Sequence, residues 1–344
     1  MSSPAATAHP GVRRSAWALA LVGALALLAV LSVAFGARVV SPGEVWGGLA
    51  GSTDGFGEAA VAKRVPRTAL ALLAGAALAV SGVVMQGVTR NPLADPGILG
   101  VNMGAALAVV VGIAHFGLVS ATSFVWVAIA GAAVAALVVY AIASLGPGGF
   151  HAGAATPLKL ALSGAAVSAA LASFISAVVL GRNDIASGVR SWQIGGVGGA
   201  DFASMAAVAP FLAGGLAISL LAAKALNSLA LGDELAAGLG ERVGLARGLA
   251  SLGAIVLAGA VTALTGPIGF VGLVVPHVVR LLIGSDHRWL LPLSALAGAV
   301  LLTAADIVGR VVARPAEIDV GIVTALVGAP FFIYIVRRQK VREL

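Results

Sequence analysis

The stretch that decides the fold is RVPRTALALLAGAALAVSGVVMQGVTRNPLADPGILG, which runs from Arg64 to Gly100. It opens with two arginines around a proline and continues through about twenty apolar residues, enough to cross a bilayer. It then breaks at Asn91-Pro92 and at Asp95-Pro96-Gly97 before it turns apolar again. A basic start, a spanning helix rich in small residues and a Pro/Gly-broken re-entry are typical of a membrane transport protein.

The composition of the whole chain supports this interpretation. Of the 344 residues 60% are hydrophobic and 10% are charged, and the mean hydropathy is +1.05. Soluble domains carry about 25% charged residues, so this chain lacks the polar surface to cover itself in water. The 46 glycines suit close helix packing in lipid. The composition predicts an all-α polytopic membrane protein with one membrane domain.

Several classes of function are disfavoured by the residue types present. There is no cysteine, and the five histidines are scattered, so we expect neither a metal site nor a cofactor. The net charge of +7 falls between apolar runs, which indicates membrane topology and not nucleic-acid binding. Without a Gly-Lys dipeptide the chain holds no phosphate-binding loop. No catalytic constellation is visible, so the chain is not expected to be an enzyme.

Ten apolar runs are long enough to count as spans. They are 16–35, 68–88, 97–114, 122–144, 159–181, 203–223, 249–265, 267–283, 289–312 and 319–336. Residues 1–15 are predicted to form an N-terminal tail, residues 16–336 the ten-helix membrane domain and residues 337–344 a basic C-terminal tail. With ten spans, 13 of the 21 lysines and arginines lie on the side of both termini. The positive-inside rule then places both ends in the cytoplasm of a bacterial cell.

The opening stretch also closely resembles part of a known family, the permease subunits of ABC importers for iron-siderophores, haem and cobalamin. The match covers roughly residues 20 to 336. It is carried by Arg64, Pro66-Arg67, Gly75, Gly82, Met85-Gln86, Asn91-Pro92-Leu93-Ala94, Pro96-Gly97 and Gly100. The resemblance implies the type II importer fold, with two permease copies, a P-loop ATPase on the inner side and a substrate-binding protein outside.

Three arginines occupy positions that hold glutamates of the binding protein in this family. They are Arg64, Arg67 and Arg310. The residues alone leave docking and intrachain pairing equally open, because Asp306 stands four residues before Arg310 and could pair with it along a helix. The resemblance favours docking.

A second informative stretch, Leu226 to Arg247, is predicted to lie in the cytoplasm. Its middle favours a short helix, with Asp233 and Glu234 in the first turn and Gly240 as a C-terminal cap. The apolar stripe of this helix requires either a partner or the lipid interface. The resemblance implies that it couples to the ATPase through Leu231, Gly232, Glu234, Ala236, Leu239 and Gly240.

A third motif, GPIGFVGLVVPHVVR, spans Gly266 to Arg280 and includes Pro267, Pro276 and His277. His277 could carry a proton, although a structural hydrogen bond is the plainer role. The breaks after residue 91 and after residue 266 follow spans of opposite direction, which predicts a weak inverted repeat. We expect these residues, together with Met85, Gln86, Asn91 and Pro92, to shape the pathway.

These features predict the membrane-embedded conduit of an ATP-driven importer. Few charges line the spans, which suits a bulky chelated cargo. We favour ferric siderophore, with haem second and cobalamin third, on the general look of the matching stretches. The rival from another class is an ion-coupled secondary transporter, which would need acidic or polar groups near the bilayer midplane.

Overall fold

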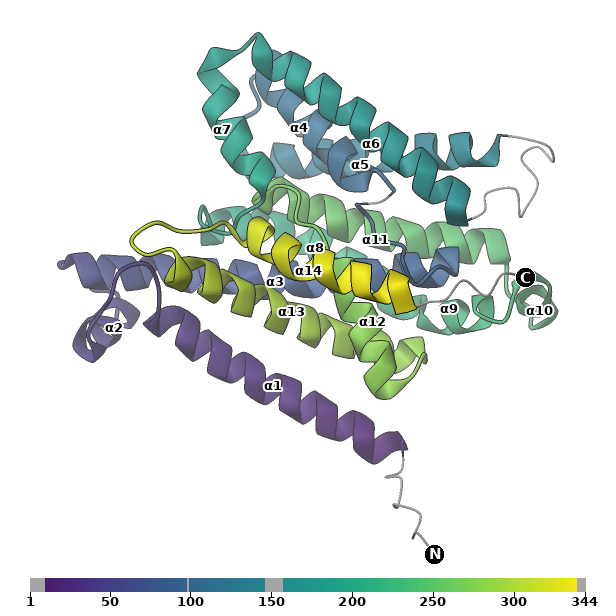
Figure 1. Cartoon of the computed structure of the whole chain (residues 1–344), viewed down its shortest axis with the longest axis horizontal. Helices are drawn as coiled ribbons and strands as arrows, with labels where there is room; N and C mark the ends of the chain where they lie inside the picture. The colour runs from purple at the N-terminus through teal and green to yellow at the C-terminus, as the bar shows by residue number, and fades with distance from the viewer. Residues whose placement is uncertain (1–9, 98, 146–156, 339–344) are drawn as a thin grey trace, which may run out of the picture.

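The computed structural model describes residues 10–97, 99–145 and 157–338, and within these ranges the chain forms fourteen helices and no strand (Figure 1). Their bounds are α1 Pro10–Ala34, α2 Pro42–Leu49, α3 Phe56–Thr89, α4 Val101–Phe116, α5 Ala121–Ser144, α6 Pro157–Leu180, α7 Asn183–Ile194, α8 Phe202–Leu221, α9 Ala223–Leu229, α10 Asp233–Gly238, α11 Val243–Thr265, α12 Val271–Ile283, α13 His287–Val312 and α14 Val320–Arg338.

The ten predicted spans correspond to α1, α3, α4, α5, α6, α8, α11, α12, α13 and α14. Seven of these helices are long and apolar enough to cross a membrane, and α4, α12 and α14 are shorter apolar helices. Two of the shorter helices, α4 and α12, directly follow the two predicted breaks in the sequence. Their length is consistent with helices that are completed by extended backbone inside the bundle.

Three predicted spans begin at least six residues earlier in the structure, among them α11, which begins at Val243 and not at residue 249. α1 begins at Pro10, so residues 10–15 continue the first helix instead of forming a tail, because proline is favourable in the first helical turn. α3 begins at Phe56, twelve residues before the predicted start, and reaches 34 residues, about 50 Å at 1.5 Å per residue. Its Arg64 and Arg67 therefore lie inside a helix. The remainder of both predicted tails, residues 1–9 and 339–344, lies outside the described residues.

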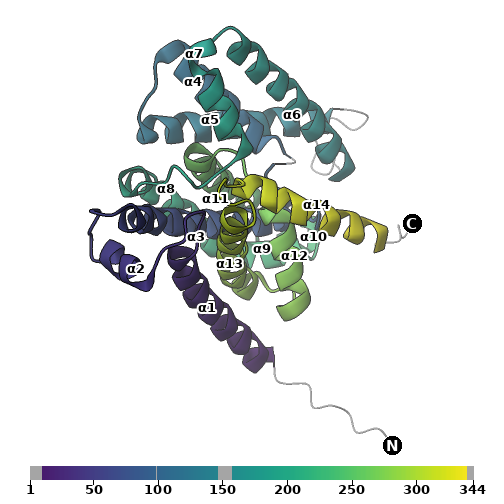
Figure 2. The ribbon, with the colours of Figure 1, turned by 60° about the vertical axis from the view of Figure 1, so that its left-hand side comes forward.

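The bundle has two distinct ends (Figures 1 and 2). At one end lie α2, the first turns of α3, α7 and the link between α13 and α14; we call this the α2 end. At the other lie α9, α10, the start of α1 and the end of α14; we call this the α10 end. An even number of crossings therefore brings both ends of the chain to the same side.

The helix pairings support the predicted inverted repeat. α3 packs against α12 and α13, and α11 packs correspondingly against α4 and α5. Gly100 directly precedes α4 and Phe270 directly precedes α12, and both adopt left-handed backbone, with φ of 74° and 69°. The two halves thus reuse one arrangement in opposite directions.

Glycines set the closest helix contacts at the centre of the bundle. Gly82 of α3 faces the backbone of Gly272 in α12, and Gly75 faces the backbone of Gly298 in α13. A Cβ atom at either position would overlap a carbonyl oxygen of the neighbouring helix. In lipid, where association depends on packing, such small residues let the helices approach.

A glycine junction at the α2 end joins three distant segments. The Gly195 carbonyl accepts a 2.9 Å bond from the Gly321 N–H, and the Gly196 N–H donates to the Thr265 carbonyl at 2.8 Å. The Gly266 Cα faces the Trp192 carbonyl so closely that a side chain there would overlap it. The glycine run after α7 therefore allows close backbone packing. The preceding residues form α7, which the sequence analysis did not predict.

Candidate functional site

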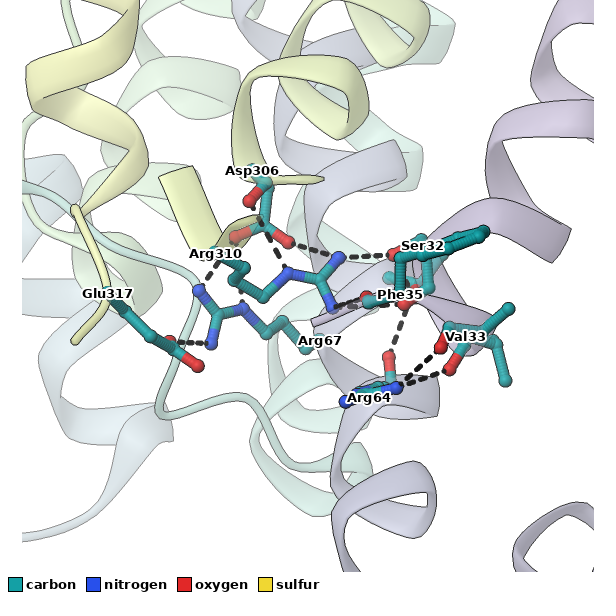
Figure 3. Close-up of polar contacts among 10 residues, drawn as sticks. Ser32, Val33, Phe35, Arg64, Arg67, Asp306, Arg310 and Glu317 are labelled. Carbon is teal, nitrogen blue, oxygen red and sulfur yellow. Dashed lines mark hydrogen bonds and ion pairs between the residues drawn. The ribbon is translucent and has the colours of Figure 1, made fainter. Parts of the chain in front are cut away.

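At the α2 end, arginine side chains satisfy the last carbonyls of α1 (Figure 3). Arg310 Nη1 donates to the Ser32 and Phe35 carbonyls at 2.9 and 3.1 Å. Arg64 Nη1 donates to the Val33 and Ala34 carbonyls at 3.0 and 2.9 Å. The final carbonyls of a helix have no partner within it, and cations near them also oppose the negative end of the helix dipole. The two arginines thus act as the cap of α1.

The same cluster contains two acidic residues (Figure 3). Asp306 pairs with Arg67 and with Arg310, each at 2.9 Å. Arg67 also binds Glu317, in the link to α14, at 2.5 Å. The side chains of Asp306 and Arg310 are each 1% exposed. A buried pair of this kind is stable only when the remaining donors find partners, and here backbone carbonyls supply them.

This geometry bears directly on the arginines predicted to dock a binding protein. Arg64, Arg67 and Arg310 are buried, and their guanidinium groups bind groups of the same chain. The intrachain pairing of Asp306 with Arg310, which the sequence left open, is present. The docking role itself stays a prediction. The exposed cations of the α2 end are Arg38, Lys63, Arg190 and Arg314.

At the α10 end, the predicted coupling segment forms two short helices, α9 and α10. The predicted helix over 232–239 is confirmed as Asp233–Gly238, and it lies between Gly232 and Gly240, with φ of 104° and 85°. Ala236 is fully buried against the bundle. Leu231, Leu235 and Leu239, spaced four residues apart, are 58%, 62% and 66% exposed. The segment therefore presents a leucine stripe, defined by these three residues, away from the bundle.

Polar contacts attach this segment to the spans. Asp233 of α10 pairs with Arg90 at the end of α3 and with Arg247 of α11. Asn227 of α9 donates to Asp286 at 2.8 Å and accepts from the His287 N–H at 2.9 Å, at the start of α13. Three spanning helices are thus held by the two short helices. None of these partner pairs was predicted, because sequence spacing does not show which chain segments meet.

The motif around Met85 and Gln86 lies at the contact of α3 with α12. Met85 is buried, and Gln86 Nε2 donates to the Gly272 carbonyl at 3.3 Å. Gln86 Oε1 accepts from Arg280 at 2.9 Å. The pair joins two spanning helices and does not face open space. These residues therefore act in the packing of the bundle in this structure.

The turn after α3 is built by its asparagine. The Asn91 side chain accepts from the Leu93 N–H at 3.0 Å, and its carbonyl accepts from the Ala94 N–H at 3.1 Å. Pro92 is exposed at the tip. Asp95 is buried and accepts from the Gly97 N–H at 2.7 Å.

In the third motif, the glycine and the prolines lie in the backbone packing of the bundle, whereas the histidine makes a side-chain contact. Gly266 and Pro267 form the glycine junction, and Pro276 is buried within α12. The His277 ring packs edge-on against Phe331 of α14, with the ring centroids 5.9 Å apart. Within the described part of the chain His277 makes an aromatic contact, whereas the sequence favoured a hydrogen bond.

A cavity that the sequence did not indicate lies near the α2 end. Its volume is about 310 Å³, and it is bounded by residues of α3, α4, α5, α7, α8 and α11. Its lining is mainly apolar and includes Leu70, Ile113, Trp192 and Met205. The cavity depends on the position of α7, a helix that the sequence analysis did not predict.

Comparisons with known proteins agree with this architecture. The ferric enterobactin transport system permease protein of Escherichia coli is 42% identical over 327 residues, 94% of this chain and 96% of that protein. The iron(3+)-hydroxamate import system permease protein of Bacillus subtilis is 43% identical over 277 residues, 80% of this chain and 71% of that protein. The hemin transport system permease protein of Yersinia pestis is 37% identical over 321 residues, 92% and 93% respectively.

Among solved structures, an inward-facing metal-chelate type ABC transporter superposes with a TM-score of 0.77 at 28% identity, over 94% of this chain and 99% of that one. The FecCD transport family matches residues 24–338. The residues matched by the family include α3 with its broken re-entry, the two short helices of the α10 end and the buried cluster of the α2 end. The chain is therefore a multi-pass membrane protein that belongs to the FecCD transport family.

Proposed function

We propose that this chain is the membrane-spanning permease subunit of an ATP-driven importer, and that it carries a ferric chelate of the siderophore type. The leucine stripe is the observation that carries the ATP-driven part of the proposal. Three leucines exposed at four-residue spacing outside a membrane bundle form an apolar face that fits the groove of another protein. The α10 end then lies in the cytoplasm, where it meets a separate ATPase subunit.

The cargo assignment rests on family membership and on the character of the spans. Relatives named for hydroxamate, citrate and enterobactin complexes of iron support a ferric siderophore. A relative named for hemin makes haem the second choice within the same machinery. In this proposal a binding protein delivers the chelate at the α2 end, to a pathway between two permease copies.

The rival of another class, an ion-coupled transporter, has little support in the described residues. Its mechanism would need an ionisable group open to the pathway near the midplane. The buried carboxylates in the described part of the chain are Asp95, in the turn after α3, and Asp306, which pairs with two arginines. Neither position provides such a group.

The leucine stripe can be tested by co-purification with the ATPase subunit. Replacing Leu235 and Leu239 together by aspartate should abolish the association, because two charges would enter an apolar contact. Val119→Asp is the control, since Val119 is 89% exposed in the link between α4 and α5, at the other end of the molecule. Unchanged association of the double variant would remove the coupling assignment.

The cargo can be tested by uptake in a strain that lacks this chain. Iron-55 is supplied as hydroxamate, citrate and catecholate complexes, with haem as a fourth cargo. We expect uptake of at least one of the three ferric chelates to require the chain and to stop when the ATPase is deleted. Uptake that persists without the ATPase and collapses with an uncoupler would instead favour the ion-coupled transporter.

A further inference from the structure

At the α10 end, one aspartate connects the short helix that carries the leucine stripe to two spanning helices. Asp233 Oδ1 lies 3.1 Å from Arg90 Nη2 and 2.8 Å from Arg247 Nη2. Its other oxygen, Oδ2, accepts from Arg247 Nη1 at 3.1 Å. Both carboxylate oxygens are therefore used, and the Arg247 pair has the two-bond geometry that fixes orientation as well as distance.

The two arginines come from helices that reach far into the bundle. Arg90 is the residue that ends α3, in left-handed backbone at φ 52°, and α3 packs against α1, α11, α12 and α13. Arg247 lies in the second turn of α11, which packs against α3, α4, α5 and α8. A displacement of Asp233 therefore acts on two central helices at once.

The backbone around Asp233 favours movement of α10 as a unit. Gly232 and Gly240 flank the helix, both at positive φ, and a Cβ at Gly240 would meet no atom within 4 Å. Glycine allows backbone rotation at little steric cost. α10 can thus pivot at both flanks, while the Asp233 carboxylate and the buried Ala236 hold it to the bundle.

We propose that Asp233 is the positioning residue that transmits movement of the ATPase-bound α10 to α3 and α11. The inference rests on the proposed function, because it assumes that the leucine stripe is where force enters. The three side chains are 27% to 44% exposed, so the pairs lie at the water boundary. Such pairs can break and re-form during a cycle without the cost of stranding a buried charge.

The test uses the complete complex of permease, ATPase and loaded binding protein in proteoliposomes. The measured quantity is the amount of iron moved per ATP hydrolysed. The cargo is the iron-55 chelate that the wild-type chain takes up in the uptake assay described above. Asp233→Asn keeps the size of the side chain and removes its charge. We expect the variant to bind the ATPase as wild type does, to hydrolyse ATP and to move at least tenfold less iron per ATP. Asp233→Glu, which keeps the charge, should recover to within about threefold of wild type.

Glu241→Gln is the matched control, because Glu241 lies close by and has no ion pair among the described residues. It should keep wild-type coupling. Arg90→Gln and Arg247→Gln remove the same contacts from the opposite side, and each should lower coupling at least threefold. Combining either with Asp233→Asn should cause little additional loss if one shared interaction is responsible.

Two results would overturn the proposal. The first is that Asp233→Asn moves as much iron per ATP as wild type does. If Asp233→Asn does not fold, the same result in both arginine variants would count instead. The other is loss of ATPase binding by Asp233→Asn, which would make Asp233 a contact residue and not a transmitter. Failure of the proposed function looks different, since wild type itself would then bind no ATPase.

Discussion

The two ends of the molecule each hold a cluster of arginines around an aspartate, but the clusters differ in depth. At the α2 end, Asp306 and its partner Arg310 are each 1% exposed and the arginines also satisfy the last carbonyls of α1. At the α10 end, Asp233 and its two arginines are partly exposed and bind mainly each other. In the first cluster, loss of Asp306 would leave the buried Arg310 without a carboxylate partner, whereas water can replace a lost member of the second. We therefore expect the first to hold the fold and the second to act in transport.

The largest effect on stability is expected from Arg310→Gln. The substitution breaks the buried pair with Asp306 and removes donors to the α1 carbonyls, so unfolding free energy should fall by about 3–5 kcal/mol. Thermal unfolding of the purified chain in detergent measures the change. Arg190→Gln, at an exposed site on α7 of the same end, is the control and should change stability by less than about 0.5 kcal/mol. Equal, small effects of both variants would contradict the structural role of the cluster.

Two glycines with positive φ sharpen the comparison. Gly266 at the α2 end and Gly240 at the α10 end have φ of 70° and 85°. Both substitutions to alanine strain the backbone, because φ is positive at each site. In Gly266→Ala the new methyl group also overlaps the Trp192 carbonyl, whereas in Gly240→Ala it meets no atom within 4 Å. We expect about 2–4 kcal/mol of destabilisation at Gly266 and about 1 kcal/mol at Gly240. The same unfolding measurement distinguishes them, and an equal cost would show that backbone strain alone decides.

The smallest effect on stability is expected where the effect on transport is largest. Asp233→Asn should change the unfolding free energy by less than about 1 kcal/mol, because ion pairs at the water boundary contribute little. Thermal unfolding at low and high salt checks this, and the small change should shrink further as salt is added. A loss comparable to that of Arg310→Gln would mean that the two clusters have the same role.

At the α2 end, the sequence could predict where the charged residues stand in the chain but not that their side chains are buried. Residues Arg64, Arg67 and Arg310 are visible as cations near span ends, and Asp306 as a helical neighbour of Arg310. That the arginines turn inward depends on α1, whose carbonyls come from residues 32–35, far away in the chain. No spacing rule connects these positions, so the burial of the arginines could not be predicted.

At the α10 end the sequence was more informative about the helix than about its contacts. Acidic residues in the first turn and Gly240 at its end predicted α10, together with an apolar stripe that needs a partner or the lipid interface. The partners of Asp233, which stand 143 residues before it and 14 residues after it, could not be read from the sequence.

The sequence by itself determined the membrane class, the ten spans, the two broken segments and the family. The first three follow from hydropathy or local backbone preference, which act over neighbouring residues, and the family follows from the resemblance of the quoted motif residues. Tertiary structure alone decided which charges are buried and that α7 lines a cavity. These depend on which distant segments meet, because a polar group in a bilayer takes its partner from whatever helix packs beside it.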